Sequence, residues 1–282
     1  MHNAKRSIVA IAILIFGTVA YGAEKSREER TAAMEALAWQ QGPTSGALED
    51  KATIKVPQGA RFLDVNNGSK FLELTGNLPS NENILVGETW WAAFSFNPAG
   101  YVKDDEKIDP DALLKDLKSS DEPGNQERRK RGMSELFTEG WYIPPHYDTA
   151  TKHLEWALRL RASDSNAPII NYTVRLLGRS GYESAILVSR PETLETDVKS
   201  FKAALAGFDF NPGEKYSEFK SGDKIAEYGL AALVAGGAAA VAVKSGFWKV
   251  ILGFLAAGWK IIAVGAVAVV GGASKLFKKK ES

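Results

Sequence analysis

The chain has 282 residues, a formal net charge of +1 at pH 7, 45% hydrophobic residues and 24% charged residues. This composition is typical of a globular protein, and it excludes both wholesale disorder and a chain made only of membrane segments. The sequence contains no cysteine, which excludes disulfides, zinc ribbons, iron–sulfur clusters, a cysteine nucleophile and a lipoprotein anchor.

Charge is distributed unevenly along the chain. Residues 221–282 carry eight lysines against three acidic residues, a net charge of +5, and the first 22 residues carry +2. The segment between them therefore has a net charge of −6. Because clustered Lys and Arg drive phosphate binding, an acidic middle segment argues against nucleic acid as a partner.

Residues 1–22 have the three parts of a secretory signal peptide. Lys5 and Arg6 form a charged start, residues 8–19 are apolar or small, and Ala20-Tyr21-Gly22 provides small residues at a cleavage site. A bilayer core of about 30 Å needs about 20 apolar residues, so this run is short for a span. The pattern predicts cleavage after Gly22, with an uncleaved N-terminal anchor as the alternative.

Residues 23–220 are predicted to form an extracytoplasmic α+β domain. Asp109 followed by Pro110 is a favoured helix start, with the aspartate as N-cap. Strands joined by short turns pair in antiparallel fashion, so we expect one mainly antiparallel sheet with helices packed on it. Helices are predicted at 24–41, 68–75, 109–117, 125–131 and 191–206, and strands at 46–56 (a hairpin), 61–63, 84–86, 89–96, 136–142, 153–161, 169–177, 182–188 and 208–210.

Residues 221–282 are predicted to be a C-terminal apolar helical hairpin or membrane anchor. Residues 225–243 are apolar or small apart from Glu227, and two further apolar runs follow at 247–259 and 261–272. Small residues spaced four apart allow membrane helices to pack closely. The residues predicted to form the anchor are Tyr228 at the start of the first run, Gly236 and Ala240 on its small-residue stripe, Trp248 and Trp259 on a bulky face of the second helix, and Lys260 on the opposite face.

The topology of this tail has several solutions. Cytoplasmic ends collect Lys and Arg, so Lys278–Lys280 are expected in the cytoplasm. With the domain outside, residues 228–243 would cross once while residues 247–280 lie along the inner face. Alternatively, the second segment crosses with Lys260 near the middle of the bilayer, at a cost of a few kcal/mol. A full hairpin violates the charge rule, and a soluble hairpin packed against the domain is the remaining alternative.

One run in the domain offers candidate chemistry. Pro144-Pro145-His146-Tyr147-Asp148 precedes His153, and His146 with Asp148 resembles a base and the carboxylate that orients it. The structural alternative is a loop between two strands, in which Asp148 accepts hydrogen bonds from the turn backbone. With only two histidines outside the leader, a three-histidine zinc site is excluded. The turn interpretation is favoured, and no cofactor or metal is predicted.

Three other features have structural explanations that we favour. The acidic residues from Asp104 to Asp111 lack a calcium-loop pattern and are expected to form a solvated linker and a helix start. Arg128–Arg131 is expected to be an exposed helix face, with anionic headgroups or an acidic partner as the functional alternative. Trp90 and Trp91 point to opposite sheet faces, so at least one belongs to the core and the other is a candidate binding platform. Motifs for serine nucleophiles and for phosphate-binding loops are absent from the sequence.

Several short motifs occur in a characteristic order, from about Glu35 to Lys280. They are Trp39-Gln40, Val56-Pro57, Arg61-Phe62-Leu63-Asp64, Gly100-Tyr101-Val102-Lys103-Asp104-Asp105, Gly140-Trp141, Pro144-Pro145-His146-Tyr147-Asp148, Trp156-Ala157, Asn171-Tyr172, Leu176-Leu177-Gly178-Arg179 and Tyr228-Gly229-Leu230. In this the sequence resembles a bacterial domain-of-unknown-function family whose members are described as uncharacterised membrane-anchored proteins. The resemblance implies a secreted and anchored bacterial protein, and it supplies no activity, cofactor or catalytic residue.

Together these patterns predict a protein of the bacterial inner membrane whose main domain faces the periplasm. The expected role is non-enzymatic, a binding or scaffolding module whose partners are membrane lipid, other envelope proteins, or further copies of the chain through the tail. The alternative is a periplasmic hydrolase or small-ligand enzyme that uses the His146/Asp148 loop. A pore with Lys260 facing water is a third hypothesis.

Overall fold

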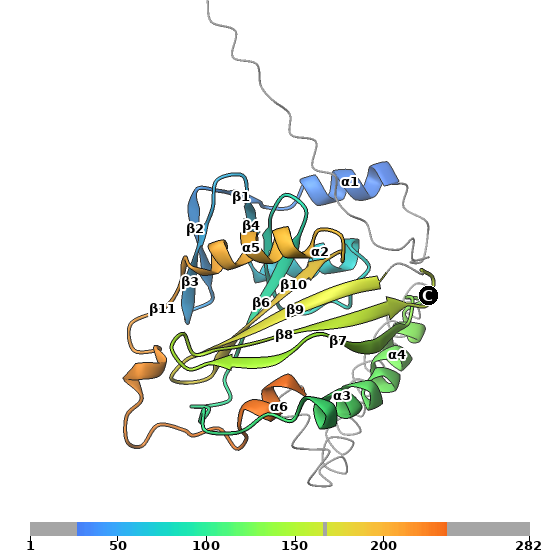
Figure 1. The fold of residues 1–282 in the computed structure, drawn as a ribbon. Coiled ribbons are helices and arrows are strands. Elements are labelled where there is room, and N and C mark those ends of the chain that lie inside the picture. Colours follow the sequence, from blue (N-terminus) through green and yellow to red (C-terminus); the bar gives the residue numbers. More distant parts are fainter. Residues whose placement is uncertain (1–26, 166–167, 236–282) are drawn as a thin grey trace, which may run out of the picture. The chain divides into compact units, whose positions relative to one another are not determined.

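The computed structural model describes residues 27–165 and 168–235 (Figure 1). One compact unit extends as far as Val234, fourteen residues beyond the predicted domain end at residue 220. The predicted signal peptide and the predicted anchor residues Gly236, Ala240, Trp248, Trp259 and Lys260 lie outside the described residues.

An eight-stranded sheet forms the centre of the unit, and every neighbouring pair in it is antiparallel. This confirms the predicted α+β class with a large antiparallel sheet. The hairpin connections explain the arrangement, since short turns can join only antiparallel neighbours. In spatial order the strands are β1 (Gln40–Gln41), β4 (Arg61–Leu63), β5 (Asn83–Val86), β6 (Trp91–Asn97), β10 (Tyr182–Ser189), β9 (Pro168–Leu177), β8 (His153–Ala162) and β7 (Leu136–Asp148).

A second sheet corrects the prediction of a single one. It contains β2 (Thr44–Leu48), β3 (Ala52–Val56) and β11 (Phe208–Phe210), in the order β11-β3-β2. The predicted hairpin is confirmed, because buried and exposed residues alternate along β3 with Ala52, Ile54 and Val56 inside. Alternation shows that one face of a strand is buried, and it leaves open which sheet the strand joins.

The main hydrophobic core lies between the first face of the large sheet, the small sheet and α5 (Leu194–Leu205). Phe201 of α5 is fully buried, and its ring lies 5.6 Å from that of Trp90 and 6.4 Å from that of Tyr172. Figure 1 shows α5 in orange across this side of the sheet. The apolar stripe of α5 thus joins the two sheets into one core.

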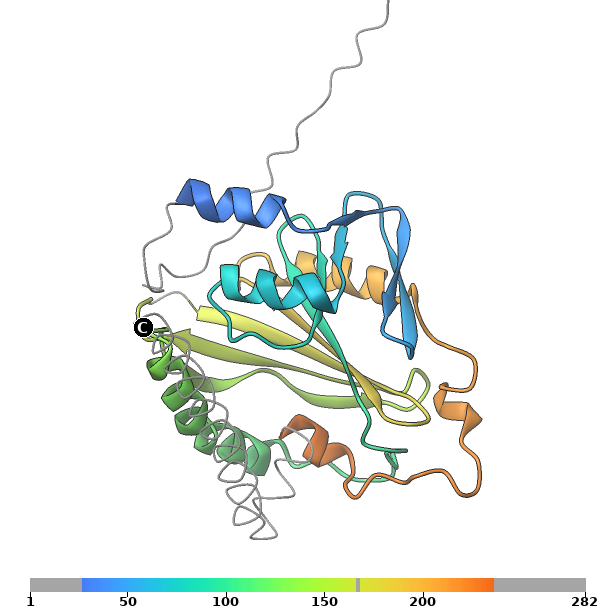
Figure 2. The ribbon, with the colours of Figure 1, turned by 180° about the vertical axis from the view of Figure 1, so that it is seen from behind.

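A smaller core covers part of the second face of the large sheet. It is formed by α2 (Val65–Leu74), seen in cyan in Figure 2, and by Met34 from α1 (Arg27–Glu35). Trp90 is buried in the first core and Trp91 packs against the second, 5.3 Å from the ring of Phe71. The prediction that the two indoles point to opposite faces is therefore confirmed.

Two further helices, α3 (Pro110–Ser119) and α4 (Asp121–Lys130), pack against β7. The predicted N-cap of α3 is confirmed, because Asp109 accepts hydrogen bonds from the backbone N–H groups of Asp111 and Ala112. The prediction that Arg128–Arg131 form an exposed face of α4 is only partly correct. Arg129 is exposed and pairs with acidic neighbours, whereas Arg128 is 9% exposed and points towards the sheet.

Strand β7 is the edge of the large sheet and continues through Pro144 and Pro145, where a loop was expected. Its pairing with β8 shifts register at three places between Thr138 and His146. Proline lacks the backbone N–H that a central strand needs, so an edge strand is where such a pair is tolerated. The turn itself begins only after Asp148.

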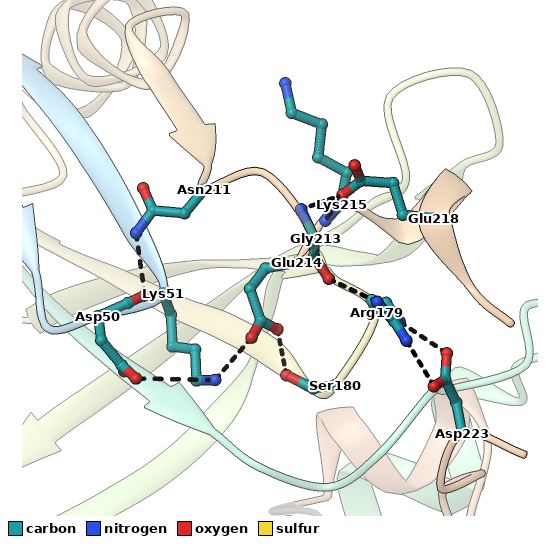
Figure 3. A network of polar contacts seen from close by, with 10 residues as sticks. All are labelled: Asp50, Lys51, Arg179, Ser180, Asn211, Gly213, Glu214, Lys215, Glu218 and Asp223. Atoms are coloured by element: carbon teal, nitrogen blue, oxygen red, sulfur yellow. Dashed lines mark hydrogen bonds and ion pairs between the residues drawn. The ribbon is translucent and has the colours of Figure 1, made fainter.

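Residues 211–226, which we call the strap, run from the small sheet along one end of the large sheet (Figure 3). Lys51 Nζ lies 2.7 Å from Glu214 Oε1, and Glu214 also accepts a hydrogen bond from the Ser180 hydroxyl. Arg179 binds both carboxylate oxygens of Asp223 at 2.7 Å. The strap contains the short helix η1 (Tyr216–Glu218) and leads to α6 (Leu230–Val234), in which Leu230, Leu233 and Val234 are buried.

The bidentate ion pair between Arg179 and Asp223 gives a testable prediction. Lysine keeps the charge but cannot bind both oxygens of Asp223 in one plane, so Arg179→Lys should loosen the strap without unfolding the sheet. We expect the backbone amides of residues 213–223 to exchange with deuterium about tenfold faster, while the amides of β9 and β10 keep their protection. Lys215→Arg, on the exposed pair with Asp209, is the control and should leave exchange unchanged. Unchanged exchange in Arg179→Lys would contradict this role.

Within the described ranges, no helix has the length and apolar character that crossing a membrane requires. Tyr228, the predicted start of the first anchor segment, is partly buried, and the helix that follows it packs on the domain.

Candidate functional site

The candidate pair His146 and Asp148 lies at the end of β7. Asp148 Oδ1 accepts hydrogen bonds from the backbone N–H groups of Ala150, at 2.8 Å, and Thr151, at 3.4 Å. These backbone hydrogen bonds, together with that from the Thr151 side chain, lower the pKa of Asp148. His146 is exposed and pairs in the strand with Glu155. Neither residue lines the cleft described below, and Asp148 stabilises the turn in which it lies.

The neighbouring Tyr147 belongs to a cluster at the strap. Its hydroxyl donates to Asp104 at 2.8 Å, and Lys152 Nζ lies 2.8 Å from the same carboxylate oxygen. Burial of Asp104 alone would raise its pKa, but the hydrogen bonds from Lys152 and Tyr147 lower it. Tyr101 stacks on Tyr216 of the strap, with ring centroids 4.4 Å apart. This part of the predicted acidic cluster therefore connects the β7–β8 turn to the strap.

A cleft of about 320 Å³ lies on the second face of the large sheet. Its size is within the range of small-molecule sites. In Figure 2 the ends of β8 and β9 lie between α2, in cyan, and α4, in green. Residues from these four elements, from β6 and β10, and from the segments 75–82 and 134–136 line the cleft.

The floor of the cleft is mostly apolar. Antiparallel register places Trp91, Val188, Asn171 and Leu158 in one row across four strands. Side chains of directly opposed residues in adjacent strands lie on the same sheet face, so these four share one surface. Of the four, Trp91, Val188 and Asn171 line the cleft. Further apolar contacts come from Leu160, Ile169 and Ile186. A flat apolar surface of this kind suits a ring or a short hydrocarbon chain.

Arg128 joins the two walls of the cleft. Its Nε donates to the carbonyl of Ser134, and its Nη2 lies 3.5 Å from the carbonyl of Gly76 at the end of α2. Burial lowers the pKa of Arg128, while the carboxylate of Asp164 opposes this effect. Asp164 in turn accepts a hydrogen bond from the Ser134 hydroxyl. An arginine remains charged at neutral pH, so this wall carries one cation next to one anion.

A second acidic group, Glu82, lies on the opposite wall. Burial raises the pKa of Glu82, and hydrogen bonds from Ser95 and Ser80 and the charge of Arg175 oppose the rise. Arg175 sits between the rings of Trp156 and Tyr182, 5.2 and 5.4 Å from their centroids. The charged groups near the cleft are thus largely balanced.

One polar side chain lies on the apolar floor. Asn171 lines the cleft and is partly exposed. Its cross-strand neighbours Val188 and Leu158 are apolar. An amide on an apolar surface needs a hydrogen-bond partner, which water or a ligand can supply. Asn171 is therefore a candidate for contact with a bound ligand.

Sequence reasoning did not identify Asn171 or Glu82 as site residues, and it named Arg128 only as part of the basic run Arg128–Arg131. A signal for Asn171 was present, because it is the one carboxamide within the apolar strand 169–174. Arg128 lies in a run of four basic residues, and neither charge nor spacing distinguishes it from its exposed neighbours. Glu82 reaches the cleft through a loop, whose path depends on tertiary contacts.

The lining of the cleft is suited to binding. Its described residues include no histidine, and two of its serines, Ser134 and Ser80, donate hydrogen bonds to the carboxylates of Asp164 and Glu82. The described lining therefore offers no imidazole base of the kind that commonly activates a serine nucleophile. Over residues 27–165 and 168–235, no group of three metal-ligating side chains lies close enough to hold an ion. What the cleft offers is an apolar surface with a few fixed polar groups.

A glycine shapes the wall that carries Glu82. A Cβ on Gly68 of α2 would lie 1.8 Å from the carbonyl oxygen of Glu82, so Gly68→Ala must push this loop away. We expect a loss of about 1–3 kcal/mol in the free energy of unfolding. Gly124→Ala in α4 is the matched control, because no heavy atom lies within 4 Å of the added carbon. That change should stabilise by up to about 1 kcal/mol. If Gly68→Ala and Gly124→Ala changed the free energy of unfolding equally in chemical unfolding, the close approach of Gly68 to the Glu82 carbonyl would be contradicted.

Comparison with known proteins gives a family and distantly similar solved structures. A family model described as a protein of unknown function, DUF2167, matches residues 40–270. The solution structure of the cyanobacterial PsbP protein, CyanoP, from Synechocystis sp. PCC 6803 aligns with 10% sequence identity and a TM-score of 0.35. That alignment covers 61% of this chain and 91% of CyanoP. No curated protein matches the sequence.

Proposed function

We propose that this chain, which belongs to the DUF2167 family of proteins of unknown function, is a non-enzymatic binding module of the bacterial cell envelope. The observation that carries the proposal is the cleft of about 320 Å³ on the second face of the sheet. Its apolar floor and its few oriented polar groups are the features of a binding pocket.

Two observations favour binding over catalysis. The described cleft-lining residues include no histidine to act as a base for Ser80 or Ser134, and the alternative site at His146 and Asp148 lies outside the cleft. The backbone hydrogen bonds that Asp148 accepts come from its own turn and end on Oδ1, and no hydrogen bond from the His146 imidazole is found among the described residues. An orienting carboxylate would instead have to accept from the imidazole.

The proposed place of the module is the periplasmic face of the inner membrane. Support comes from the signal-like residues 1–22 and from the apolar tail that ends in Lys278–Lys280. The proposed partners are membrane lipid and other envelope proteins, with self-association through the tail. The ion pairs of the strap hold residues 211–226, which precede the apolar part of the tail, against the domain.

Crosslinking and pull-down of the full-length protein from membranes tests the binding role. Ala162 lines the cleft and is 8% exposed, so Ala162→Phe should fill the cleft and remove bound envelope components. Ala150→Phe, in the exposed β7–β8 turn, is the matched control and should keep them. A third form replaces residues 236–282 by an unrelated single span, which separates partners of the domain from partners of the tail. If no defined component depends on the cleft or on the tail, the binding role is wrong.

The proposed topology has its own test, which the absence of cysteine makes simple. A cysteine at Gln58, in an exposed turn of the domain, should react with a membrane-impermeant maleimide in cells whose outer membrane is permeabilised. A cysteine at Ser282 should react only after the inner membrane is disrupted. Protection of Gln58→Cys in permeabilised cells would rule out a periplasmic domain.

A further inference from the structure

We propose that the cleft binds a small carboxylate with an apolar body, and that the guanidinium of Arg128 pairs with the carboxylate group. This inference rests on the binding role proposed above and specifies its ligand class. The geometry that carries it is one buried cation in the wall of an apolar cleft, with no ion pair to any described residue.

Arg128 is the only cationic residue among the described residues that line the cleft. Its side chain belongs to a residue that is 9% exposed, and no described carboxylate forms an ion pair with it. A buried charge is costly unless it is paired, because burial removes its hydration. Since an arginine keeps its charge at neutral pH, an anion that enters the cleft would supply the missing partner.

The guanidinium keeps donors for a carboxylate. Its Nε donates to the carbonyl of Ser134, and its Nη2 lies 3.5 Å from the carbonyl of Gly76. No described residue accepts a hydrogen bond from Nη1. Both N–H groups of Nη1 and one of Nη2 are therefore left, and this edge of an arginine can bind both oxygens of one carboxylate.

Two hydroxyl groups in the lining are poorer candidates for binding an anion. The hydroxyl of Ser134 already donates to Asp164, and that of Ser80 donates to Glu82. A hydroxyl has one proton to donate, so each would have to give up its present bond. Recognition of an anion therefore depends mainly on Arg128.

The acidic residues of the walls limit the charge of the ligand. Asp164 raises the pKa of Arg128, against the larger effect of burial, but it is exposed, so water and salt screen its charge. Glu82 lies on the opposite wall. Two carboxylates near one cation would repel a doubly charged phosphate, whereas a single negative charge is matched by one guanidinium.

Apolar side chains lie close to the cation in the chain and in the cleft. Leu136 lines the cleft two residues after Ser134, and it pairs with Ala162, which also lines it. Leu160 and Ile169, directly opposed in β8 and β9, continue this lining. A volume of about 320 Å³ is at the lower end of the range for small-molecule sites, so one aromatic ring with a short chain fits.

The test is calorimetric titration of 4-phenylbutanoate and 4-phenylbutanamide into the full-length protein in lipid nanodiscs at pH 7. The two probes share the same ring and chain and differ in the charge of the head group, and empty nanodiscs correct for partition into lipid. We expect the carboxylate to bind about tenfold more tightly than the amide, since hydrogen bonds between charged groups are the stronger ones. Inorganic phosphate, which has no apolar body, should bind about tenfold more weakly than the carboxylate or not at all.

Three variants locate the anion. Arg128→Gln removes the charge and keeps an N–H donor, so the carboxylate should lose about tenfold in affinity and bind no more tightly than the amide. Arg131→Gln removes the same charge from the exposed end of α4, and as the matched control it should keep the wild-type preference. Asp164→Asn removes the negative charge near Arg128 while still accepting from Ser134, and it should tighten carboxylate binding about two- to threefold without affecting the amide.

The outcomes separate this inference from the proposed function. The inference is overturned if the amide or phosphate binds the wild type as tightly as the carboxylate, if the carboxylate does not bind, or if Arg128→Gln keeps the carboxylate preference. If Arg128→Gln fails to fold, unchanged carboxylate affinity in Asp164→Asn overturns it instead. In each of these cases the binding role still stands if Ala162→Phe removes envelope components in the pull-down. If Ala162→Phe and the tail replacement remove nothing while the carboxylate binds through Arg128, the ligand class is right and the envelope role is wrong.

Discussion

Replacement of Glu183 by glutamine should raise the free energy of unfolding by about 3 kcal/mol at pH 7. Glu183 lies in β10 with none of its surface exposed, between Phe96 of β6 and Leu176 of β9. Neither carboxylate oxygen has a hydrogen-bond partner among the described residues. Burial, with the negative charges of Glu49 and Glu82, raises the pKa of Glu183 to about 9.

The sign of the effect follows from the direction of this shift. Below the ordinary pKa of 4.5 the group is protonated in both states and costs nothing through ionisation. As the pH rises above 4.5, the unfolded chain loses its proton while the folded chain keeps it, and stability falls by about 1.4 kcal/mol per pH unit up to about pH 9. Glutamine is neutral throughout and removes this dependence.

Chemical unfolding at several pH values measures the effect. The difference between Glu183→Gln and wild type should be near zero at pH 4 and should grow steadily up to pH 9. Glu88→Gln, at an exposed position, is the control and should change stability by less than about 0.5 kcal/mol at each pH. A constant difference between pH 4 and pH 9 would show that Glu183 finds a partner in the folded protein.

Removing the ring of Phe201 should destabilise the protein by about 3–5 kcal/mol. Phe201 is 0% exposed, and its ring contacts those of Trp90, Phe94 and Tyr172 from the large sheet. These three aromatic residues leave little room for the structure to close around an alanine, so the lost burial is accompanied by a cavity. Since α5 joins the two sheets through Phe201, removing its ring weakens the packing of the main core.

Denaturant unfolding followed by tryptophan fluorescence tests the role of Phe201. The midpoint should fall in Phe201→Ala while the slope with denaturant stays the same, because the native and unfolded surfaces are similar. Tyr142→Ala is the matched control, since this ring is 47% exposed, and its effect should stay below about 0.5 kcal/mol. A loss of less than about 1 kcal/mol in Phe201→Ala would mean that α5 is not an essential part of the core.

Much of the fold was predictable because local chemistry determines it. The alternation in β3 and the Asp109-Pro110 start of α3 depend only on residues close in sequence. Helix α2 begins at Val65, three residues before the prediction, because Asp64 caps it by accepting a hydrogen bond from the Asn67 N–H. That cap leaves no trace in the apolar periodicity from which the helix was predicted.

The errors arose where tertiary position overrides local preference. Pro144 and Pro145 predict a loop in isolation, yet at a sheet edge their missing N–H groups cost no ladder hydrogen bond. The separate small sheet was missed because β11 pairs with β3 across more than 150 residues of sequence. Long-range pairing of this kind has no signature in either strand alone.

The candidate site was less predictable than the fold. His146 and Asp148 were candidates because their residue types are common in catalysis, and the structure places both at the end of β7, outside the cleft. The cleft is made of residues that are ordinary in sequence, such as Val188, Ile169 and Asn171. Only the register of four strands brings them onto one surface.

The two edges of the large sheet determine how copies of this domain meet when they are crowded together. The unpaired N–H and C=O groups of an open strand edge can pair with a strand from another molecule, which is the first step of ordered aggregation. Here one edge is the two-residue β1, and the other is β7, where a proline pair and three register shifts interrupt the row of free N–H groups. Neither edge offers a neighbour a continuous ladder, so many copies can be packed densely without their sheets merging into fibrils.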